Sequence, residues 1–340
     1  MEIETNEVVN SNSVSFGSLF SGAGGFDLGL ERASWNGIGM TCKFQVEWDK
    51  HCQQVLQHHW PEVPKWEDVQ DVNGADLPPV EVIAWGSPCQ DLSNAGRRAG
   101  LVGEKSSMFF EGIRIIKEMR EATNGTYPTV SIWENVTGAL NSNNGADFET
   151  VIREMADAGC THIEWRVLDA QWFGVAQRRR RIFVVAVWGN PASIRSGQQI
   201  LSVAKRSECD FAQGGEQREA DSGKSLGGNS SDIQPLTIDA TRMNHVRVHG
   251  DGLTRTLPAR MGTGGNNVPF LVQDNQTIVR KLTEIECERL MGWNDDHTRF
   301  RADGKETSSS QRYKMCGNGV AAPVATWIGE KIIKTIRTEK

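Results

Sequence analysis

The sequence lacks the marks of a secreted, disulfide-bonded or membrane-spanning protein. Its seven cysteines are an odd number without any Cys-x-x-Cys pair, so neither a disulfide framework nor a zinc cluster is expected. The longest apolar stretches, such as residues 182–188, fall far short of the roughly 20 residues that a membrane-spanning helix needs. Residues 1–13 lack the apolar core of a secretion signal and are expected to form a polar tail. These absences favour a globular protein of a reducing cytoplasm.

The chain also lacks the positive net charge that is typical of proteins that coat nucleic acid. Its formal net charge is −6 at pH 7, but local patches matter more than the sum. Residues 240–281 carry five arginines and one lysine against two aspartates, which makes this segment net +4. If the protein contacts nucleic acid, this segment is the favoured place.

Short apolar runs alternate with amphipathic stretches in the first half of the chain. Strands separated by helices predict βαβ units and a parallel sheet that is covered on both faces, which is an α/β fold. The expected strands are residues 14–20, 41–48, 80–85, 129–134, 163–168 and 181–187, and expected helices include residues 109–119 and 148–158.

The composition changes after Gly189. Residues 190–275 are rich in Gly, Ser, Asn and Gln and have no strong helical period, which predicts short strands and ordered loops. Residues 283–291 are expected to form a helix with a capping box between Thr283 and the glutamate three residues on. A last helix, residues 320–336, is expected to place apolar side chains four residues apart on one face.

A glycine-rich turn, FSGAGG at residues 20–25, joins the first expected strand to its helix. Glycine lets the backbone approach a ligand, and the free N–H groups of the helix start can face an anionic group. Such a turn serves NAD, FAD and S-adenosylmethionine alike, or no ligand at all. At the end of the second strand, Glu47 suits ribose hydroxyls and Trp48 offers a face for adenine. Asp68 could accept from an adenine amino group or be a solvated loop carboxylate.

Cys89 lies in the segment GSPCQ, residues 86–90, directly after an apolar strand. The carboxyl ends of such strands carry the sites of α/β folds. A lone cysteine is usually a small apolar core residue, but a position between a proline turn and polar residues favours an exposed thiol. Residues 96–105 follow with three glycines and the basic Arg97 and Lys105, which predicts a mobile loop that closes over a phosphate backbone.

Two further segments carry charged residues next to expected strands. Glu134, in ENV at residues 134–136, ends the next strand and is expected beside Cys89. Four consecutive arginines, residues 178–181, open a later strand. Such a run is usually solvated or bound to phosphate, but Arg179 and Arg181 alternate along the strand and could point inward together.

In this order and spacing the segments resemble the DNA cytosine-5 methyltransferase family, in its compact bacterial or phage type. The resemblance implies a Rossmann-like S-adenosylmethionine-dependent methyltransferase sheet with a smaller, irregular β-rich target-recognition domain. It implies a catalytic domain of residues 14–189 plus 312–340 and a target-recognition domain of residues 190–311. The motifs are FSGAGG, EWD, GSPCQDLS, ENV, QRRRR, RKLTEIECERLMGW and CGNGV, which together span nearly the whole chain.

The resemblance also implies a mechanism in which the chain methylates C5 of a cytosine flipped out of double-stranded DNA. Cys89 would add to C6 of the base as a thiolate. Glu134 would hold the N3 and 4-amino edge. Arg181, with Arg179, would hold the O2 side.

Further residues match family positions that hold cofactor or DNA. The resemblance implies no metal, and a monomer is expected. The implied partners are double-stranded DNA and a cognate restriction endonuclease that acts separately. Target-recognition regions of the family often contain a threonine followed by an aliphatic residue. Both Thr256-Leu257 and Thr237-Ile238 match this pattern. The implied cofactor-binding residues are Phe20, Gly22, Gly24, Gly25, Glu47, Trp48, Asp68, Pro88, Asn318, Gly319 and Val320. The implied DNA-binding residues are Gln90, Ser93, Arg97, Lys105, Arg242, Arg255, Thr256 and Arg260.

Three other interpretations stay open at this stage. A tRNA-methylating relative shares the catalytic residues, although its usual Cys-Phe-Thr signature is absent from this sequence. A non-catalytic DNA-binding relative would be expected to have lost Cys89 or Glu134, and both are present. A nicotinamide oxidoreductase would fit the glycine-rich turn but leaves Cys89, Glu134 and Arg181 without a role.

Overall fold

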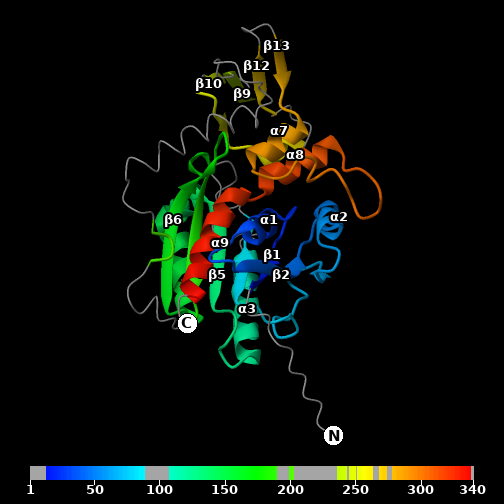
Figure 1. Cartoon of the computed structure of the whole chain (residues 1–340). Coiled ribbons are helices and arrows are strands. Elements are labelled where there is room, and N and C mark those ends of the chain that lie inside the picture. The colour runs from blue at the N-terminus through cyan, green and yellow to red at the C-terminus, as the bar shows by residue number, and fades with distance from the viewer. Residues whose placement is uncertain are drawn as a thin grey trace.

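A computed structural model shows a large sheet with helices on both faces and a smaller sheet above it (Figure 1). Among the residues that it describes, no helix is long and apolar enough to cross a membrane. The described residues are 13–88, 107–189, 199–202, 236–242, 245–249, 251–262, 268–273 and 278–337.

The large sheet has seven strands in the order β3-β2-β1-β4-β5-β8-β6. The chain therefore starts in the middle of the sheet and extends it first to one side and then to the other. This order brings the ends of β1, β2, β4 and β5 to one edge. The strands are β1 (Ser13–Leu19), β2 (Gly39–Val46), β3 (Lys65–Trp66), β4 (Val82–Trp85), β5 (Val130–Val136), β6 (His162–Asp169) and β8 (Arg180–Val187).

Six strands run parallel, as predicted, but the expectation of a wholly parallel sheet is wrong for β8. This strand is antiparallel to both of its neighbours, β5 and β6. A parallel connection needs a crossover of a dozen or more residues, usually a helix. Only the short helical turn η4 (Ala170–Phe173) and the two-residue strand β7 (Gln177–Arg178) lie between β6 and β8. The chain therefore turns straight back.

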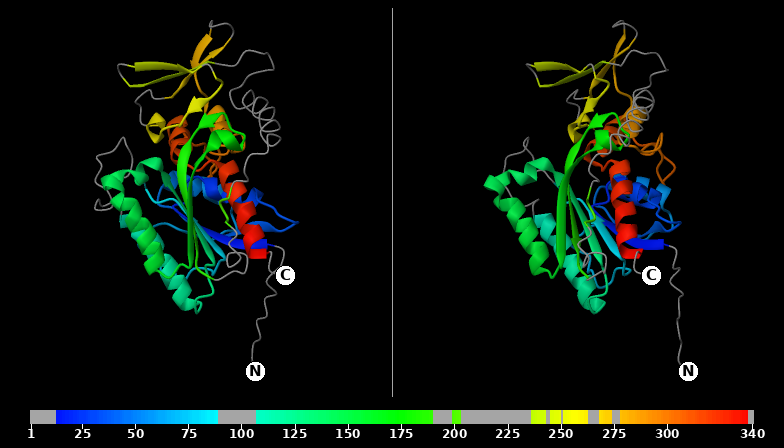
Figure 2. Two further views of the ribbon diagram at one scale, coloured as in Figure 1. Left: turned by 90° about the vertical axis from the view of Figure 1, so that its left-hand side faces the viewer. Right: turned by 60° about the vertical axis from the view of Figure 1, so that its left-hand side comes forward.

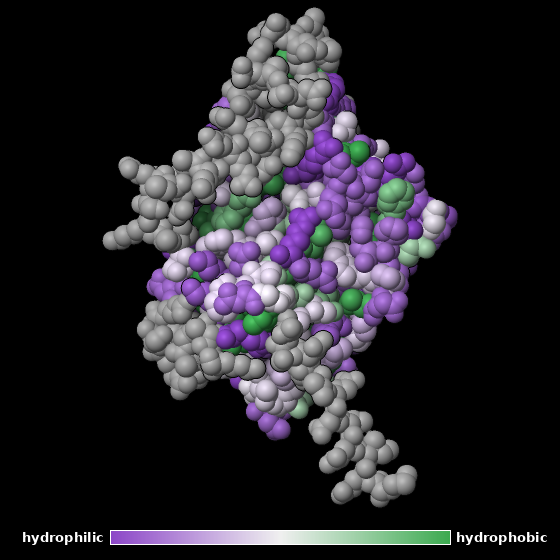
Figure 3. Space-filling model, viewed as in Figure 1, coloured by the Kyte–Doolittle hydropathy of each residue, from purple (hydrophilic) through white to green (hydrophobic). Residues whose placement is uncertain are grey.

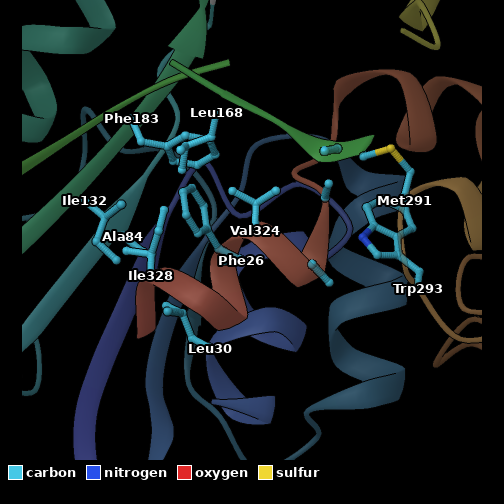
Figure 4. Close-up of a cluster of buried hydrophobic side chains, with 14 of the residues drawn as sticks. Phe26, Leu30, Ala84, Ile132, Leu168, Phe183, Met291, Trp293, Val324 and Ile328 are labelled. Atoms are coloured by element: carbon cyan, nitrogen blue, oxygen red, sulfur yellow. The ribbon is translucent and has the colours of Figure 1, made fainter. Parts of the chain in front are cut away.

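Helices cover the two faces of the sheet (Figure 2). Each face has its own cluster of buried apolar side chains. On one face α1 (Gly25–Arg32) and α9 (Ala322–Arg337) pack together over β1, β4 and β5. Figure 4 shows Phe26 and Leu30 of α1 meeting Val324 and Ile328 of α9 there. On the other face lie α3 (Ser107–Ala122) and α4 (Ala146–Asp157).

The predicted apolar face of the last helix is confirmed, since Val324, Ile328 and Ile332 are all buried. The helices α1 and α9 approach closely at Gly29. A Cβ atom there would lie 2.5 Å from the carbonyl oxygen of Ala322, so only glycine fits this contact.

The smaller sheet is antiparallel, with the order β10-β9-β12-β13. It confirms the prediction of short strands in this glycine-rich part of the chain. Helices α7 and α8 lie between the two sheets (Figure 1), and α7 has the predicted capping box. On the face that Figure 3 shows, hydrophilic side chains predominate in the described part. The remaining elements are α2 (Lys50–His59), β9 (Leu236–Arg242), β10 (His245–His249), β11 (Thr254–Arg255), β12 (Phe270–Gln273), β13 (Ile278–Lys281), α7 (Glu284–Leu290) and α8 (Ser309–Asn318).

Truncation of Ile328 tests the packing between α1 and α9. Because this side chain is fully buried, we expect Ile328→Ala to lower the free energy of unfolding by about 3 kcal/mol. Urea denaturation followed by circular dichroism measures the change. Lys334→Ala, an exposed position on the same helix, should change stability by less than about 0.5 kcal/mol. Equal effects of the two substitutions would contradict the assignment of Ile328 to the core.

Candidate active site

A cavity of about 310 Å³ lies at the edge where the central strands end. One wall comes from the residues that follow β1, β2 and β4 and from the ends of β5 and β8. Helix α8 forms the opposite wall. The lining residues are Phe20, Gly22, Ala23, Glu47, Asp49, Cys52, Gly86, Ser87, Pro88, Glu134, Val136, Arg181, Gln311, Lys314, Met315, Gly317 and Asn318.

The glycine-rich turn is fastened to the end of β2 by the carboxylate of Glu47. This carboxylate accepts the N–H of Gly22 at 2.7 Å and the N–H of Asp49 at 2.7 Å. Burial raises the pKa of Glu47, and the two N–H donors oppose the rise. Gly22 has φ 58°, in the left-handed region, and a Cβ there would meet no atom within 4 Å. The turn thus presents bare backbone to the cavity.

The structure divides the predicted cofactor residues into two groups. Phe20, Gly22, Glu47, Pro88 and Asn318 line the cavity. The other predicted residues do not line it: Trp48, Asp68, Gly24, Gly25, Gly319 and Val320. The side chain of Trp48 is 72% exposed, and the carboxylate of Asp68 accepts the N–H of Gln70.

Two of these residues, Gly25 and Val320, join the two ends of the chain. A Cβ on Gly25 would lie 2.6 Å from the carbonyl oxygen of Val320, so the start of α1 touches the turn between α8 and α9. The indole N–H of Trp293 donates to the same carbonyl oxygen at 3.0 Å. These residues hold the wall of the cavity in place and do not face into it.

A buried ion pair faces the same cavity from β5 and β8. Arg181 Nε lies 3.1 Å from Glu134 Oε1. Burial raises the pKa of Glu134, while the charges of Arg181 and Arg179 oppose the rise. A Cβ on Gly86 would lie 3.3 Å from Glu134 Oε2, so the absence of a side chain there leaves the carboxylate accessible. Glu134 thus lies at the edge of the Pro88 turn, as expected from the strand order, and Arg181 reaches the same edge because β8 is antiparallel to β5.

The turn at Pro88 is held by the strand beside it. Trp133 Nε1 donates to Ser87 Oγ at 3.1 Å, and Asn135 Nδ2 donates to the Ser87 carbonyl oxygen at 3.3 Å. The residues on either side of Glu134 therefore fix the backbone that leads to position 89. The predicted residues Cys89, Gln90, Ser93, Arg97 and Lys105 lie outside the described residues.

Residues 14–334 match the family model described as C-5 cytosine-specific DNA methylase. The chain belongs to this family. It is 31% identical over 329 residues to the type II methyltransferase M.Bsp6I of Bacillus sp. strain RFL6, with coverage of 94% of this chain and 98% of the relative. The type II methyltransferase M.HhaI of Haemophilus parahaemolyticus is 28% identical over 331 residues and is covered, like this chain, to 93%.

A solved structure supports the same fold. The Dnmt2 methyltransferase of S. pombe matches with a TM-score of 0.65 at 14% identity, over 95% of this chain and 99% of that one. The chain is thus a DNA cytosine-5 methyltransferase on a Rossmann-like sheet.

Arg179 of the methyltransferase does not line the cavity with Arg181. Its guanidinium is buried and donates to the carbonyl oxygens of Gly319 at 2.6 Å, Gly317 at 3.0 Å and Leu257 at 3.3 Å. Burial alternates along the arginine run, so Arg179 is turned inward as expected, but β8 starts only at Arg180. Arg179 precedes this strand and points instead to the junction with residues 254–257.

The same junction gives a role to Gln177, which the sequence analysis did not single out. Its side chain accepts the N–H of Leu257 at 3.0 Å and donates to the Leu290 carbonyl oxygen at 2.9 Å. Nearby, the Thr256 hydroxyl donates to the Arg178 carbonyl oxygen at 2.7 Å. In the sequence, only the position of this glutamine at the start of the arginine run pointed to a role. That position does not indicate which residues the side chain contacts.

Helix α8 contributes cavity residues that the sequence analysis also missed. Gln311, Lys314 and Met315 are spaced three and four residues apart, which places them on one helix face. Lys314 Nζ is 2.6 Å from Asp49 Oδ2, so the helix is tied to the N-terminus of α2 across the cavity. The helical spacing in QRYKM was the available signal.

Replacement of Arg179 tests its role at the junction. We expect Arg179→Met to lower the free energy of unfolding by about 3 kcal/mol, because buried carbonyl oxygens lose a charged donor. Arg181→Met, at a position with one paired carboxylate, should lower it less and lower activity more. Urea denaturation and a methylation assay measure the two effects. A stability of Arg179→Met equal to that of the wild type would refute this role.

Proposed function

We propose that the protein transfers a methyl group from S-adenosyl-L-methionine to C5 of a cytosine flipped out of a specific double-stranded DNA sequence, through a covalent bond between Cys89 and C6. One observation carries the proposal. The Glu134–Arg181 pair and the Gly22–Glu47 contact face the same cavity, beside the turn that leads to Cys89.

The residues present fit the cofactor. The volume is of the order of the smaller ligand pockets, roughly 300 Å³, and Glu47 keeps lone pairs for ribose hydroxyls after accepting two N–H groups. The bare backbone at Gly22 allows close approach, and the exposed Trp48 is free to cover an adenine ring. When bound, S-adenosylmethionine supplies an electrophilic methyl group.

Each charged residue then has one task. The Cys89 thiolate adds to C6 of the cytosine, which makes C5 nucleophilic. Glu134, whose pKa is raised by burial, holds the N3 and 4-amino edge and assists protonation at N3. Arg181 offsets the negative charge that develops on the O2 side. After methylation, loss of the C5 proton expels Cys89 and restores the aromatic ring.

Contacts with DNA are proposed for both sides of the cavity. Arg255 and Arg260 are exposed in the segment that is joined to β7, and Arg242 lies on β9. Thr256, Gln90, Ser93, Arg97 and Lys105 complete the proposed set. Residues 190–311 would form the target-recognition domain, against a catalytic domain of residues 14–189 plus 312–340. We propose a monomer in the bacterial cytoplasm, paired with a separate endonuclease.

Trapping of the covalent bond tests the nucleophile. With duplex DNA that contains 5-fluorocytosine at the target site, we expect the wild type and S-adenosylmethionine to form an adduct that survives denaturation. The fluorine blocks loss of the C5 substituent, so Cys89 cannot leave. Gel mobility and mass spectrometry detect the product. Cys89→Ala should give none; an adduct of Cys89→Ala, or no adduct of the wild type with DNA but one with tRNA, would overturn the proposal.

Replacement of Glu134 tests the proton donor. We expect Glu134→Gln to lower kcat by about 10²–10³-fold, since an amide cannot assist protonation at N3. Binding of S-adenosylhomocysteine, measured by calorimetry, should stay within a factor of two or so of the wild type because Glu134 belongs to the base side of the site. A kcat close to that of the wild type would remove Glu134 from the mechanism.

A further inference from the structure

Two stacked histidines lie behind the glycine-rich turn. The ring of His59, the last residue of α2, and the ring of His297 have centroids 4.3 Å apart and an interplanar angle of 11°. His297 is 1% exposed and also contacts the rings of Trp60 and Trp293, with centroids at 6.2 and 5.2 Å. The mechanism proposed above uses neither histidine.

Each of the two rings bonds a backbone carbonyl oxygen: His59 bonds that of His297, and the ring of His297 bonds that of Ala23, which lines the cavity. His59 Nε2 is 2.7 Å from the His297 carbonyl oxygen, and His297 Nε2 is 2.7 Å from the carbonyl oxygen of Ala23. A carbonyl oxygen only accepts, so both rings carry their proton on Nε2. Burial lowers the pKa of His297 to about 3 and also lowers that of His59. Both rings are therefore neutral donors at pH 7.

The Ala23 carbonyl oxygen needs a side-chain donor because of its position in the chain. It precedes Gly24, the N-cap of α1, and so lies outside the hydrogen-bond ladder of the helix. The N–H of the same peptide plane, on Gly24, donates to the Ser21 carbonyl oxygen at 3.0 Å. With both of its ends bonded, this planar unit has one orientation. Ala23 itself lines the cavity.

If His297 only filled space, a histidine would stabilise the fold less than an apolar ring at this position. Its Nδ1 is buried without a hydrogen-bond partner among the described residues, and an unsatisfied buried nitrogen destabilises a fold. A phenylalanine ring would fill a similar volume without that nitrogen. What the histidine adds is the Nε2–H donor to Ala23.

We propose that His297, oriented by His59, is a positioning residue for the cofactor. Its Nε2–H holds the Ala23 carbonyl and so sets the backbone from Gly22 to Gly24 in the shape that receives S-adenosylmethionine. The pair also links this turn to α2, whose N-cap Asp49 lines the other part of the cavity. The inference rests on the proposed use of the turn as the cofactor site.

Calorimetric titration with S-adenosylhomocysteine tests the inference on the full chain. We expect His297→Phe to weaken binding about tenfold, the effect of one lost buried hydrogen bond. The KM for S-adenosylmethionine should rise by a similar factor, while the KM for DNA and kcat change little. His297→Gln, whose side-chain amide can donate from a nearby position, should restore affinity to within about threefold of the wild type.

The controls separate this inference from the proposed function. His58→Phe changes the exposed neighbour of His59 and should bind like the wild type. A wild type that fails to bind S-adenosylhomocysteine would refute the cofactor site itself. If the wild type binds, equal affinity of His297→Phe overturns the inference, as does equal weakening by Phe and Gln. Should His297→Phe not fold, His59→Phe decides: unchanged affinity refutes the histidine relay, and weakening by about threefold or more supports it.

Discussion

The guanidinium of Arg179 donates to carbonyl oxygens of residues 257, 317 and 319, and so joins three segments that lie far apart in the sequence. One segment leads into β8 of the large sheet, the second lies between β10 and β12 of the smaller sheet, and the third turns from α8 into α9. A buried cation is tolerated only when several acceptors surround it. These acceptors are backbone atoms, so the contact constrains the path of the chain and not merely its side chains.

The geometry of the cavity depends on that constraint. Helix α8 forms one wall of the cavity and ends at Asn318, between two of the carbonyl groups that Arg179 binds. Gln177 adds a second link from the same short segment to Leu257. The part of the chain proposed to read DNA is therefore fastened to the part proposed to hold cofactor and base. Movement of one relative to the other has to act through these hydrogen bonds.

Within the cavity, burial and charge act in opposite directions on two carboxylates. Glu134 has a positive partner in Arg181, whereas Glu47 has mainly backbone N–H donors. For both, burial raises the pKa and the partners oppose the rise. The difference in partners suits different tasks: a paired carboxylate can exchange a proton with a base, and one fixed by N–H groups can accept hydrogen bonds from hydroxyls.

The sequence alone determined most of the elements and the order of the motifs. Strand and helix periods, the capping box at Thr283 and the apolar face of α9 are local properties, so residue spacing was enough to predict them. The same reasoning placed Glu134 at the edge of the Pro88 turn, where parallel strands end together, whereas Arg181 opens β8 and reaches that edge because this strand is antiparallel. Resemblance of the motifs then indicated the family, which the match over residues 14–334 shows.

Tertiary structure alone decided the direction of β8, the separate tasks of Arg179 and Arg181, and the pairing of His59 with His297. A run of arginines reads the same whether its members face a cavity or a ring of carbonyl groups. His297 and Ala23 are 274 positions apart, and no periodicity relates them. Hydrogen bonds of this kind depend on which backbone groups the packing leaves without a partner, and that is settled only when the whole chain has folded.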